Sequence, residues 1–160
     1  MRESYQCGGT LDLPQRNARS SSTGIFERTR YRYGMKLTDE LTPGANTVRS
    51  YGPGEIRVGD IVLTRSCLIT ATELVTDWRP TSVDDLEISD LDPILALEPE
   101  IVVLGVGERQ RFPRMEWTAA LLQRGVGCEV MITGAACRTY NVLVSEDRRV
   151  VAAFLLACRP

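Results

Sequence analysis

The sequence predicts one α/β domain with a β-rich N-terminal half that contains a hairpin. Two patterns lead to this prediction. Residues 51–75 hold short apolar runs separated by glycine-containing turns, as antiparallel strands do. Residues 101–156 alternate strand-like and helix-like segments, an order that favours parallel pairing through right-handed crossovers. A chain of 160 residues that is 43% hydrophobic can bury one sizeable core.

Residues 1–34 are predicted to be a mobile N-terminal extension, and residues 35–160 to be the single domain. The run at 19–24 is rich in arginine and serine, and no apolar periodicity surrounds it. The extension holds six arginines and three acidic residues, a net charge of +3, whereas the rest of the chain has a net charge of −5. The alternative is that the protein proper begins at Met35.

The first elements of the domain are expected to be short strands. Residues 51–54, Tyr-Gly-Pro-Gly, form a turn signal. The apolar runs at 55–58 and 60–63 flank a single glycine and are expected to pair as a hairpin. Further short strands are expected at 67–69 and 73–75.

The second half is expected to begin with a short helix followed by a buried strand. Ser82 and Asp90 are candidate helix caps, because their side chains can accept bonds from unpaired amides. A helix over residues 91–97 is expected to end before Pro99. The run at 101–104 is apolar throughout, which is typical of a strand buried on both faces.

A longer helix is expected from Pro113, which suits a first helical turn, to about Gln123, with Gly125 as its C-terminal stop. Residues 128–132 are the next expected strand. The helix has two neighbouring apolar faces, one with Met115, Ala119 and Leu122 and one with Trp117 and Leu121.

The last helix and strand are the clearest elements in the sequence. Thr133 is expected to be the N-cap of the helix. Ala136, Tyr140 and Leu143 follow at i, i+4 and i+7 and form one apolar face. The continuous apolar run at 150–156 predicts a central strand that is covered on both sides.

The composition excludes several kinds of site. The chain has no histidine, which rules out Ser-His-Asp and Cys-His nucleophile systems and histidine-ligated metals. Its five cysteines are widely spaced and form no CxxC pair, which argues against a disulfide framework and against a zinc ribbon. This cysteine pattern fits a reducing compartment. We expect no cofactor and no metal.

Charge and hydropathy also limit the partners. A net charge of −2 gives no reason to expect nucleic acid. No window approaches the ~18 consecutive apolar residues of a membrane span. Arginine outnumbers lysine 18 to 1, which we interpret as a bias of GC-rich coding and hence a bacterial source. We therefore expect a cytoplasmic protein, or one of the mitochondrial matrix if the source is eukaryotic.

Two groups of residues are candidates for a pocket or an interaction surface. In the first group, Gly105 and Gly107 end a buried strand and precede Arg109. Exposed amides together with a guanidinium could hold a carboxylate or a phosphate at the carboxyl end of a strand. The alternative is a tight turn with solvated arginines, because Gln110 replaces the third glycine of a GxGxxG motif.

The second group lies in the last helix and comprises Thr133, Cys137, Arg138, Tyr140 and Asn141. A helix start and a neighbouring arginine would both lower the pKa of the Cys137 thiol. The alternative, which we favour, is that Cys137 is a small packing residue, because free cysteine is often buried. Tyr140 and Asn141 could line a pocket, or they could fix the fold through hydrogen bonds.

A set of short segments carries a family likeness, namely 51–56, 64–66, 77–78, 99–100, 105–107, 129–131, 135–143, 148–150 and 152–153. By these segments the chain resembles a family of small α/β domains that is largely uncharacterised in bacteria and archaea. Its eukaryotic members include the third assembly factor of mitochondrial complex I and an adipogenesis-associated protein. The resemblance implies a three-layer fold with a central mixed, largely parallel sheet, and it implies no established enzyme activity. The resemblance covers residues from about Met35 to Leu156.

Two functions remain open after the sequence analysis. The first is a non-catalytic interaction or assembly-factor-like module with an unidentified protein partner, which the resemblance links to respiratory complex assembly. The second is a protein that binds a small anionic ligand, or a thiol-dependent enzyme that uses Cys137 and Arg138. The missing histidine and the weak loop motifs favour the first.

Overall fold

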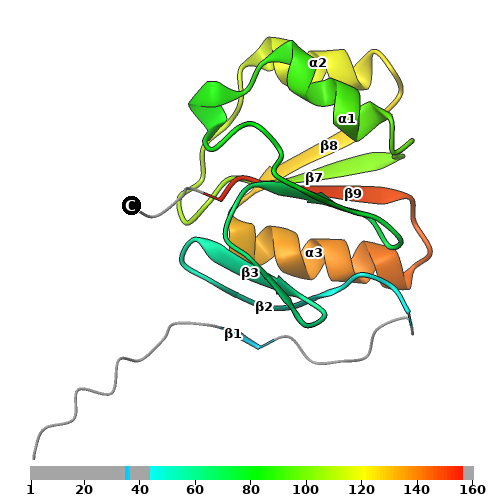
Figure 1. Ribbon diagram of the computed structural model, residues 1–160. Coiled ribbons are helices and arrows are strands. Elements are labelled where there is room, and N and C mark those ends of the chain that lie inside the picture. The colour runs from blue at the N-terminus through cyan, green and yellow to red at the C-terminus, as the bar shows by residue number, and fades with distance from the viewer. Residues whose placement is uncertain (1–34, 37–43, 157–160) are drawn as a thin grey trace, which may run out of the picture. The chain divides into compact units, whose positions relative to one another are not determined.

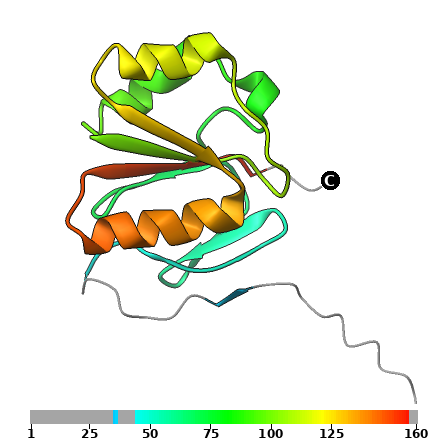
Figure 2. The ribbon, with the colours of Figure 1, turned by 180° about the vertical axis from the view of Figure 1, so that it is seen from behind.

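Two β-sheets and three α-helices make up the described part of the chain. The computed structural model describes the backbone at residues 35–36 and the whole of residues 44–156. The predicted extension over residues 1–34 lies outside these residues. Figures 1 and 2 show the arrangement from opposite sides.

The N-terminal sheet is antiparallel and has the order β1-β2-β3-β4. The turn at residues 53–54 joins β2 to β3, and Gly54 has a φ of 72° there. The predicted hairpin is confirmed, because β3 and β4 pair antiparallel around Gly59. The strands of this sheet are β1 (Met35–Lys36), β2 (Val48–Gly52), β3 (Glu55–Val58) and β4 (Ile61–Leu63).

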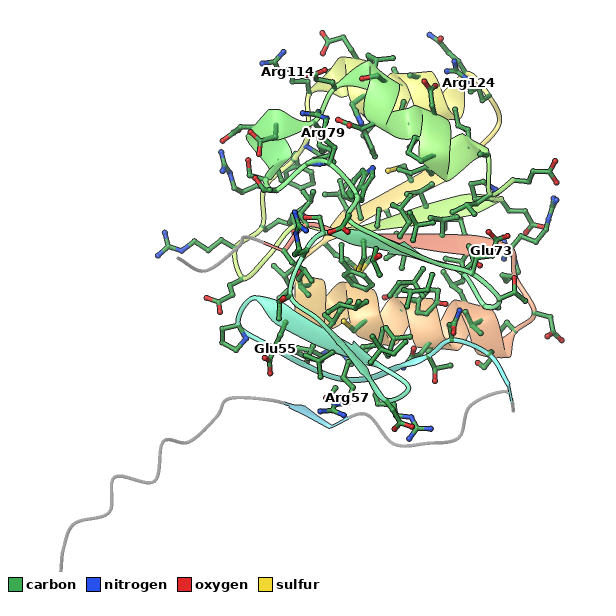
Figure 3. All side chains as sticks on the ribbon, in the orientation of Figure 1. Glu55, Arg57, Glu73, Arg79, Arg114 and Arg124 are labelled. Carbon is green, nitrogen blue, oxygen red and sulfur yellow. The ribbon has the colours of Figure 1, made fainter. Side chains whose placement is uncertain are left out.

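One face of this sheet belongs to the core. Along β3, Ile56 and Val58 are buried, whereas Glu55 and Arg57 are exposed. Figure 3 labels the two charged side chains on the outer side of the sheet. This alternation follows from the two-residue period of a strand that is covered on one face.

The second sheet has five strands in the order β6-β5-β9-β7-β8. It is mixed, as expected, but it is not largely parallel, since only two of its four pairings are parallel. The pair β5-β6 is antiparallel because a short turn, over residues 70–73, joins the two strands. The strands are β5 (Cys67–Ile69), β6 (Leu74–Thr76), β7 (Ile101–Gly105), β8 (Gly127–Met131) and β9 (Val150–Phe154).

Strand β9 lies at the centre of this sheet, as the apolar run at 150–156 predicts. All five of its residues are buried. The neighbouring β7 sends Val103 to one face and Val102 and Leu104 to the other, and all three are fully buried. Both faces of the sheet are therefore covered, which explains why these strands have no polar side.

The helices lie on both faces of the five-stranded sheet. α1 and α2 cover one face, and α3 lies on the other face, between this sheet and strands β2 and β3 (Figures 1 and 2). The helical elements are the short 3₁₀ turns η1 (Val83–Asp85) and η2 (Ile88–Leu91), α1 (Asp92–Leu95), α2 (Met115–Leu122) and α3 (Thr133–Ser145).

Several predicted helix boundaries are wrong. α1 has only four residues, because Leu91 belongs to η2 and residues 96 and 97 form a turn. α2 begins at Met115 rather than at Pro113, since Arg114 has an extended ψ of 145°. Ser82 precedes η1 without a side-chain cap bond. Asp90 does cap a helix start, but from inside η2, where its carboxylate completes a capping box by accepting a bond from the backbone N–H of Glu87 at 2.7 Å.

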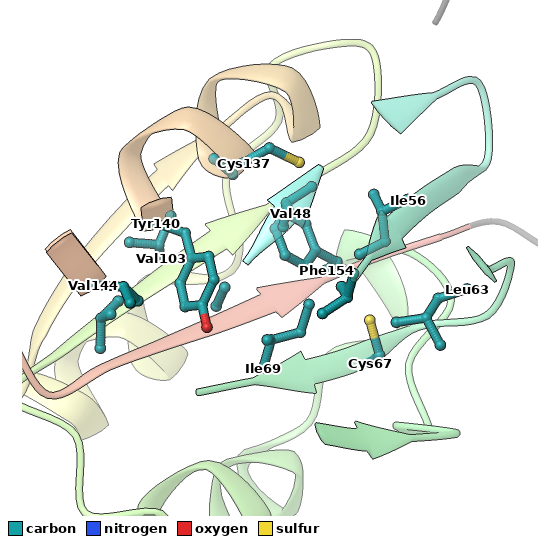
Figure 4. Packing of buried hydrophobic residues seen from close by; sticks show 14 of the residues in the cluster. Val48, Ile56, Leu63, Cys67, Ile69, Val103, Cys137, Tyr140, Val144 and Phe154 are labelled. Carbon is teal, nitrogen blue, oxygen red and sulfur yellow. The ribbon is translucent and has the colours of Figure 1, made fainter. Parts of the chain in front are cut away.

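Each face of the five-stranded sheet has its own apolar cluster. The cluster under α3 includes Phe154, Tyr140 and Cys137 together with Val48 and Ile56 from the antiparallel sheet (Figure 4). The cluster under α1 and α2 is built around two tryptophans, Trp78 and Trp117. Of the two apolar faces of α2, the one with Trp117 and Leu121 is the buried one.

Candidate functional site

A pocket of about 410 Å³ lies where the two sheets meet at the carboxyl ends of β7 and β9. Such a volume is within the usual range for small-molecule sites. Open α/β sheets commonly bind ligands at the carboxyl ends of their strands. The pocket is lined by Gly52, Pro53, Gly54, Val106, Gly107, Glu108, Arg109, Arg111, Thr133, Leu155 and Leu156.

The loop after β7 is fastened to the start of α3 by a reciprocal pair of hydrogen bonds. The N–H of Gly107 donates to the hydroxyl of Thr133 at 2.9 Å, and the N–H of Thr133 donates to the carbonyl of Gly107 at 2.8 Å. Gly107 has a φ of 94°, which favours glycine. The predicted N-cap role of Thr133 is wrong, because Ile132 precedes the helix and no side chain caps it. The hydroxyl serves the neighbouring loop instead.

Gly105 is buried and does not line the pocket. A Cβ at this position would lie 2.7 Å from Cδ1 of Phe154 and 3.3 Å from Cβ of Ala136. The absence of a side chain therefore allows β7 to pack closely against β9 and α3. This is a packing role, and it separates Gly105 from Gly107, which lies only two residues further along.

The charged residues of the pocket are not equivalent. Arg111 is already paired, because its Nη2 contacts both carboxylate oxygens of Asp84 at 2.9 and 2.8 Å. Arg109 is exposed and has no hydrogen bond or ion pair with any residue that the structure describes. Glu108 also lines the pocket and makes no ion pair with Arg109. The pocket rim therefore carries one uncompensated positive charge and one uncompensated negative charge.

Cys137 is fully buried in the cluster under α3 (Figure 4). The pKa of its thiol is raised to about 12, chiefly by burial and to a smaller extent by Cys67, while Arg138 opposes these effects. The guanidinium of Arg138 is exposed, and its Nη1 donates to the hydroxyl of Tyr51 at 2.6 Å. Desolvation thus outweighs both the helix start and the neighbouring cation. This geometry matches the packing alternative for Cys137.

Tyr140 and Asn141 both bind the segment that leads into β2. The hydroxyl of Tyr140 donates to the carbonyl of Asn46 at 2.7 Å, and burial raises the pKa of this phenol. The side-chain amide of Asn141 donates to the carbonyl of Val48 at 2.8 Å and accepts from the N–H of Val48 at 2.9 Å. These residues attach the antiparallel sheet to α3, and neither lines the pocket.

The structure therefore divides the predicted site residues into three places. Gly107, Arg109 and Thr133 line the pocket. Arg138 is on the surface beside Tyr51. The remaining predicted residues are buried, namely Gly105, Cys137, Tyr140 and Asn141.

Two parts of the pocket were not predicted from the sequence. The sequence indicates only a turn at residues 52–54 and only the end of a strand at Leu155 and Leu156. Each segment carries a recognisable local signal. Nothing local indicates that they meet, because they are about 100 positions apart in the chain.

Within residues 44–156 no three or more acidic or cysteine side chains gather in a way that could hold a metal ion. No helix in this part of the chain has the length and apolarity needed to cross a membrane.

The chain is similar to solved structures and to proteins from bacteria and vertebrates. A crystal structure of a Bordetella parapertussis protein has a TM-score of 0.67 and 38% identity, with 71% of this chain and 97% of that chain covered. A solution structure of a Bordetella pertussis protein, described as a Mth938-like domain, has a TM-score of 0.64 and 32% identity, with 76% and 92% covered. These likenesses show a small mixed α/β fold.

Sequence relatives bear different names. A "13 kDa major membrane protein" of Francisella tularensis is 41% identical over 119 residues, which are 72% of this chain and 95% of that protein. The human "NADH dehydrogenase [ubiquinone] 1 alpha subcomplex assembly factor 3" is 31% identical over 147 residues, which are 89% of this chain and 77% of that protein. Residues 48–155 match the family described as "Protein of unknown function (DUF498/DUF598)". The chain belongs to this family.

Proposed function

We propose that this protein is a non-catalytic interaction module that binds a protein partner and assists the assembly of a larger complex. The observation that carries the proposal is the similarity to assembly factor 3 over 89% of the chain. The candidate site supports it, because the buried Cys137 has a raised pKa and its thiolate is therefore scarce at neutral pH. By the same likeness, the complex would be a respiratory NADH dehydrogenase. We further propose, from the composition, that the protein is cytoplasmic.

This proposal is tested in the cell from which the chain comes. The tagged full chain is cross-linked and purified, and its partners are identified by mass spectrometry. In parallel, the gene is deleted, and the respiratory complexes are resolved by native electrophoresis and assayed for NADH:quinone activity. We expect assembly intermediates to accumulate in the deletion strain. Restoration by the Cys137→Ala chain is expected as well, because no thiol chemistry is involved.

Two outcomes would count against the assembly role. One is a fully assembled, fully active complex in the deletion strain. The other is rescue by the parent but not by Cys137→Ala when both chains fold equally well, which would favour a thiol-dependent enzyme.

A second candidate function is the binding of a small anionic ligand in the 410 Å³ pocket. The specific observation is that Arg109 lines this pocket without a partner among the described residues. An anionic group would pair with Arg109, while the apolar remainder of a ligand would contact Leu155 and Leu156. Glu108 on the same rim favours a ligand that also carries a hydrogen-bond donor.

Titration of the full chain with acetate, inorganic phosphate and a hydrophobic amino acid, followed by NMR, tests this candidate. We expect the amino acid to shift the resonances of Gly107 and Leu156 at lower concentration than the two simple anions. Arg109→Gln should weaken the effect, and Arg111→Gln, whose arginine is already paired, should weaken it less. Equal responses in all three titrations would argue against a site.

A further inference from the structure

The outer side of α2 is unusually apolar for a surface that faces solvent. Met115 is 81% exposed and Leu122 is 67% exposed. They are seven residues apart and so lie on the same side of the helix, with Ala119 between them. Phe112, three residues before Met115, is 72% exposed. We use the name α2 outer face for Met115, Ala119 and Leu122, and Phe112 lies in the non-helical segment just before the helix.

This exposure is not a by-product of core formation. The opposite side of the helix already supplies the core residues Trp117 and Leu121, which are 2% and 0% exposed. A helix that is apolar on both sides normally has both sides covered. Large apolar residues that are exposed next to one another on a soluble protein often mark a site of protein interaction.

The charges at the ends of the α2 outer face indicate what would cover it. Arg114 immediately precedes the helix, and Arg124 follows its last residue by two positions. Figure 3 shows both side chains projecting away from the sheet at the two ends of α2. Neither forms an ion pair with a described residue, and the bond of Arg124 to the carbonyl of Ala120 leaves its charge uncompensated. Glu116 is the one acidic residue of the helix.

Charge disfavours two candidate occupants of the α2 outer face, a second copy of the chain and residues 1–34 of the same chain. An antiparallel pairing of two copies centred on Ala119 would align the apolar residues, but it would place Arg114 of one copy opposite Arg124 of the other. Residues 1–34 carry a net charge of +3, so they would also be repelled by these arginines.

We propose that the α2 outer face binds an amphipathic helix of a partner protein whose apolar side is flanked by acidic residues at both ends. Phe112, Met115 and Leu122 would contact the apolar side, and Ala119 would allow close approach of the two helices. Arg114 and Arg124 flank the eight-residue helix at its two ends, so the acidic residues would lie at the two ends of the partner's apolar side. The inference rests on the proposed function, because it names the surface through which a partner is bound.

The test uses two designed helical peptides with the same leucine face, one with glutamates and one with lysines at both ends. Binding to the full chain is measured by fluorescence anisotropy. Since the chain has a net charge of −2, nonspecific attraction would favour the lysine peptide. We expect at least tenfold tighter binding of the glutamate peptide, and this preference would have to come from local arginines.

Three variants separate the parts of the proposal. Met115→Ser with Leu122→Ser should weaken the glutamate peptide at least tenfold. Arg114→Glu with Arg124→Glu should reverse the preference toward the lysine peptide. Val142→Ser is the matched control, because Val142 is 54% exposed on α3, and it should leave binding unchanged. Unaltered thermal melting establishes that each variant is folded.

Equal binding of both peptides, or binding of neither, would overturn the proposal. A dimer of the full chain in sedimentation that Met115→Ser with Leu122→Ser dissociates would also overturn it, in favour of a second copy as occupant. The peptide assay reports on this face alone, whereas partner identification in the native cell reports on the proposed function. Partner capture that survives the double serine change would place the partner elsewhere and leave the proposed function intact.

Discussion

At the scale of single residues, Asn141 acts on β2 as a neighbouring strand would. Its side-chain nitrogen donates to the carbonyl of Val48, and its side-chain oxygen accepts from the N–H of Val48. Val48 is fully buried, so water cannot replace these bonds. A buried backbone group without a partner costs about 1–3 kcal/mol. Asn141 is therefore a structural residue, although asparagine is also a common residue in binding pockets.

Asn141→Leu should lower the free energy of unfolding by roughly 2–4 kcal/mol, because leucine has a similar size but leaves both backbone groups of Val48 without this partner. Urea denaturation followed by circular dichroism measures the change. Val142→Ala, at the exposed neighbouring position, is the control and should change stability by less than about 0.5 kcal/mol. A similar small effect at Asn141 would refute the anchoring role.

The buried thiols make stability depend on alkaline pH. Burial raises the pKa of Cys67 and of Cys137 from 9.0 to about 12. The unfolded chain loses these protons near pH 9, while the folded chain keeps them until about pH 12. Stability is therefore full below pH 9 and should fall as the pH rises through this window, by up to about 1.4 kcal/mol per pH unit for each thiol.

Denaturant melts at pH 8, 9, 10 and 11 test this dependence. Cys137→Ala should reduce the slope, whatever it does to the absolute stability. The raised pKa of the Tyr140 phenol acts in the same direction at higher pH. An unchanged slope in Cys137→Ala would mean that this thiol ionises normally in the folded chain.

At the scale of elements, α2 and α3 end in the same way with different residues. After α2, the N–H of Val126 bonds to the carbonyl of Leu121, and Gly125 takes a φ of 75°. After α3, the N–H of Arg148 bonds to the carbonyl of Leu143, and Asp147 takes a φ of 56°. Both ends are Schellman motifs, and the left-handed position favours glycine. The end of α3 therefore holds a strained residue.

Asp147→Gly should stabilise the protein by about 0.5–1 kcal/mol, because it relieves the left-handed strain at the end of α3. Gly125→Ala should destabilise it by about 1 kcal/mol, since a Cβ there meets no atom within 4 Å and only the backbone cost remains. Thermal melts of the two variants measure both effects. Destabilisation by Asp147→Gly would show that the aspartate side chain contributes more than its backbone costs.

At the scale of the whole molecule, most elements follow from local patterns in the sequence, and most site contacts do not. The hairpin around Gly59 and the buried strand β9 were predictable, because apolar period and glycine turns act within a few residues. The partner of the Thr133 hydroxyl lies 26 residues away in the chain. No periodicity encodes such a contact.

The sequence also left the choice between the two faces of α2 open. Both faces are apolar, so periodicity alone cannot assign the buried one. The choice depends on the space beneath the helix, where Trp117 packs with residues from β7 and β9. The prediction of a largely parallel sheet was wrong for a related reason. The antiparallel pairing of β5 with β9 is a tertiary contact that local patterns do not encode.

Removal of residues 1–34 should leave the domain folded, because composition and charge both change at the boundary with the rest of the chain. Thermal unfolding of the shortened chain should occur within a few degrees of the full chain. The NMR spectrum should retain the resonances of β9 and α3. A large loss of stability would show that the extension belongs to the domain and that the boundary at Met35 is misplaced.

The pocket has walls from both sheets, and this has a thermodynamic consequence. Pro53 and Gly54 form the turn between two strands of the antiparallel sheet, whereas Gly107 and Leu156 follow strands of the other sheet. The complete pocket exists only in chains whose two sheets are docked. A ligand of the pocket would therefore raise the population of the docked state by mass action. Its affinity would also fall in Asn141→Leu, although Asn141 does not line the pocket. Binding at the pocket would thus report whether the two sheets of the fold are docked.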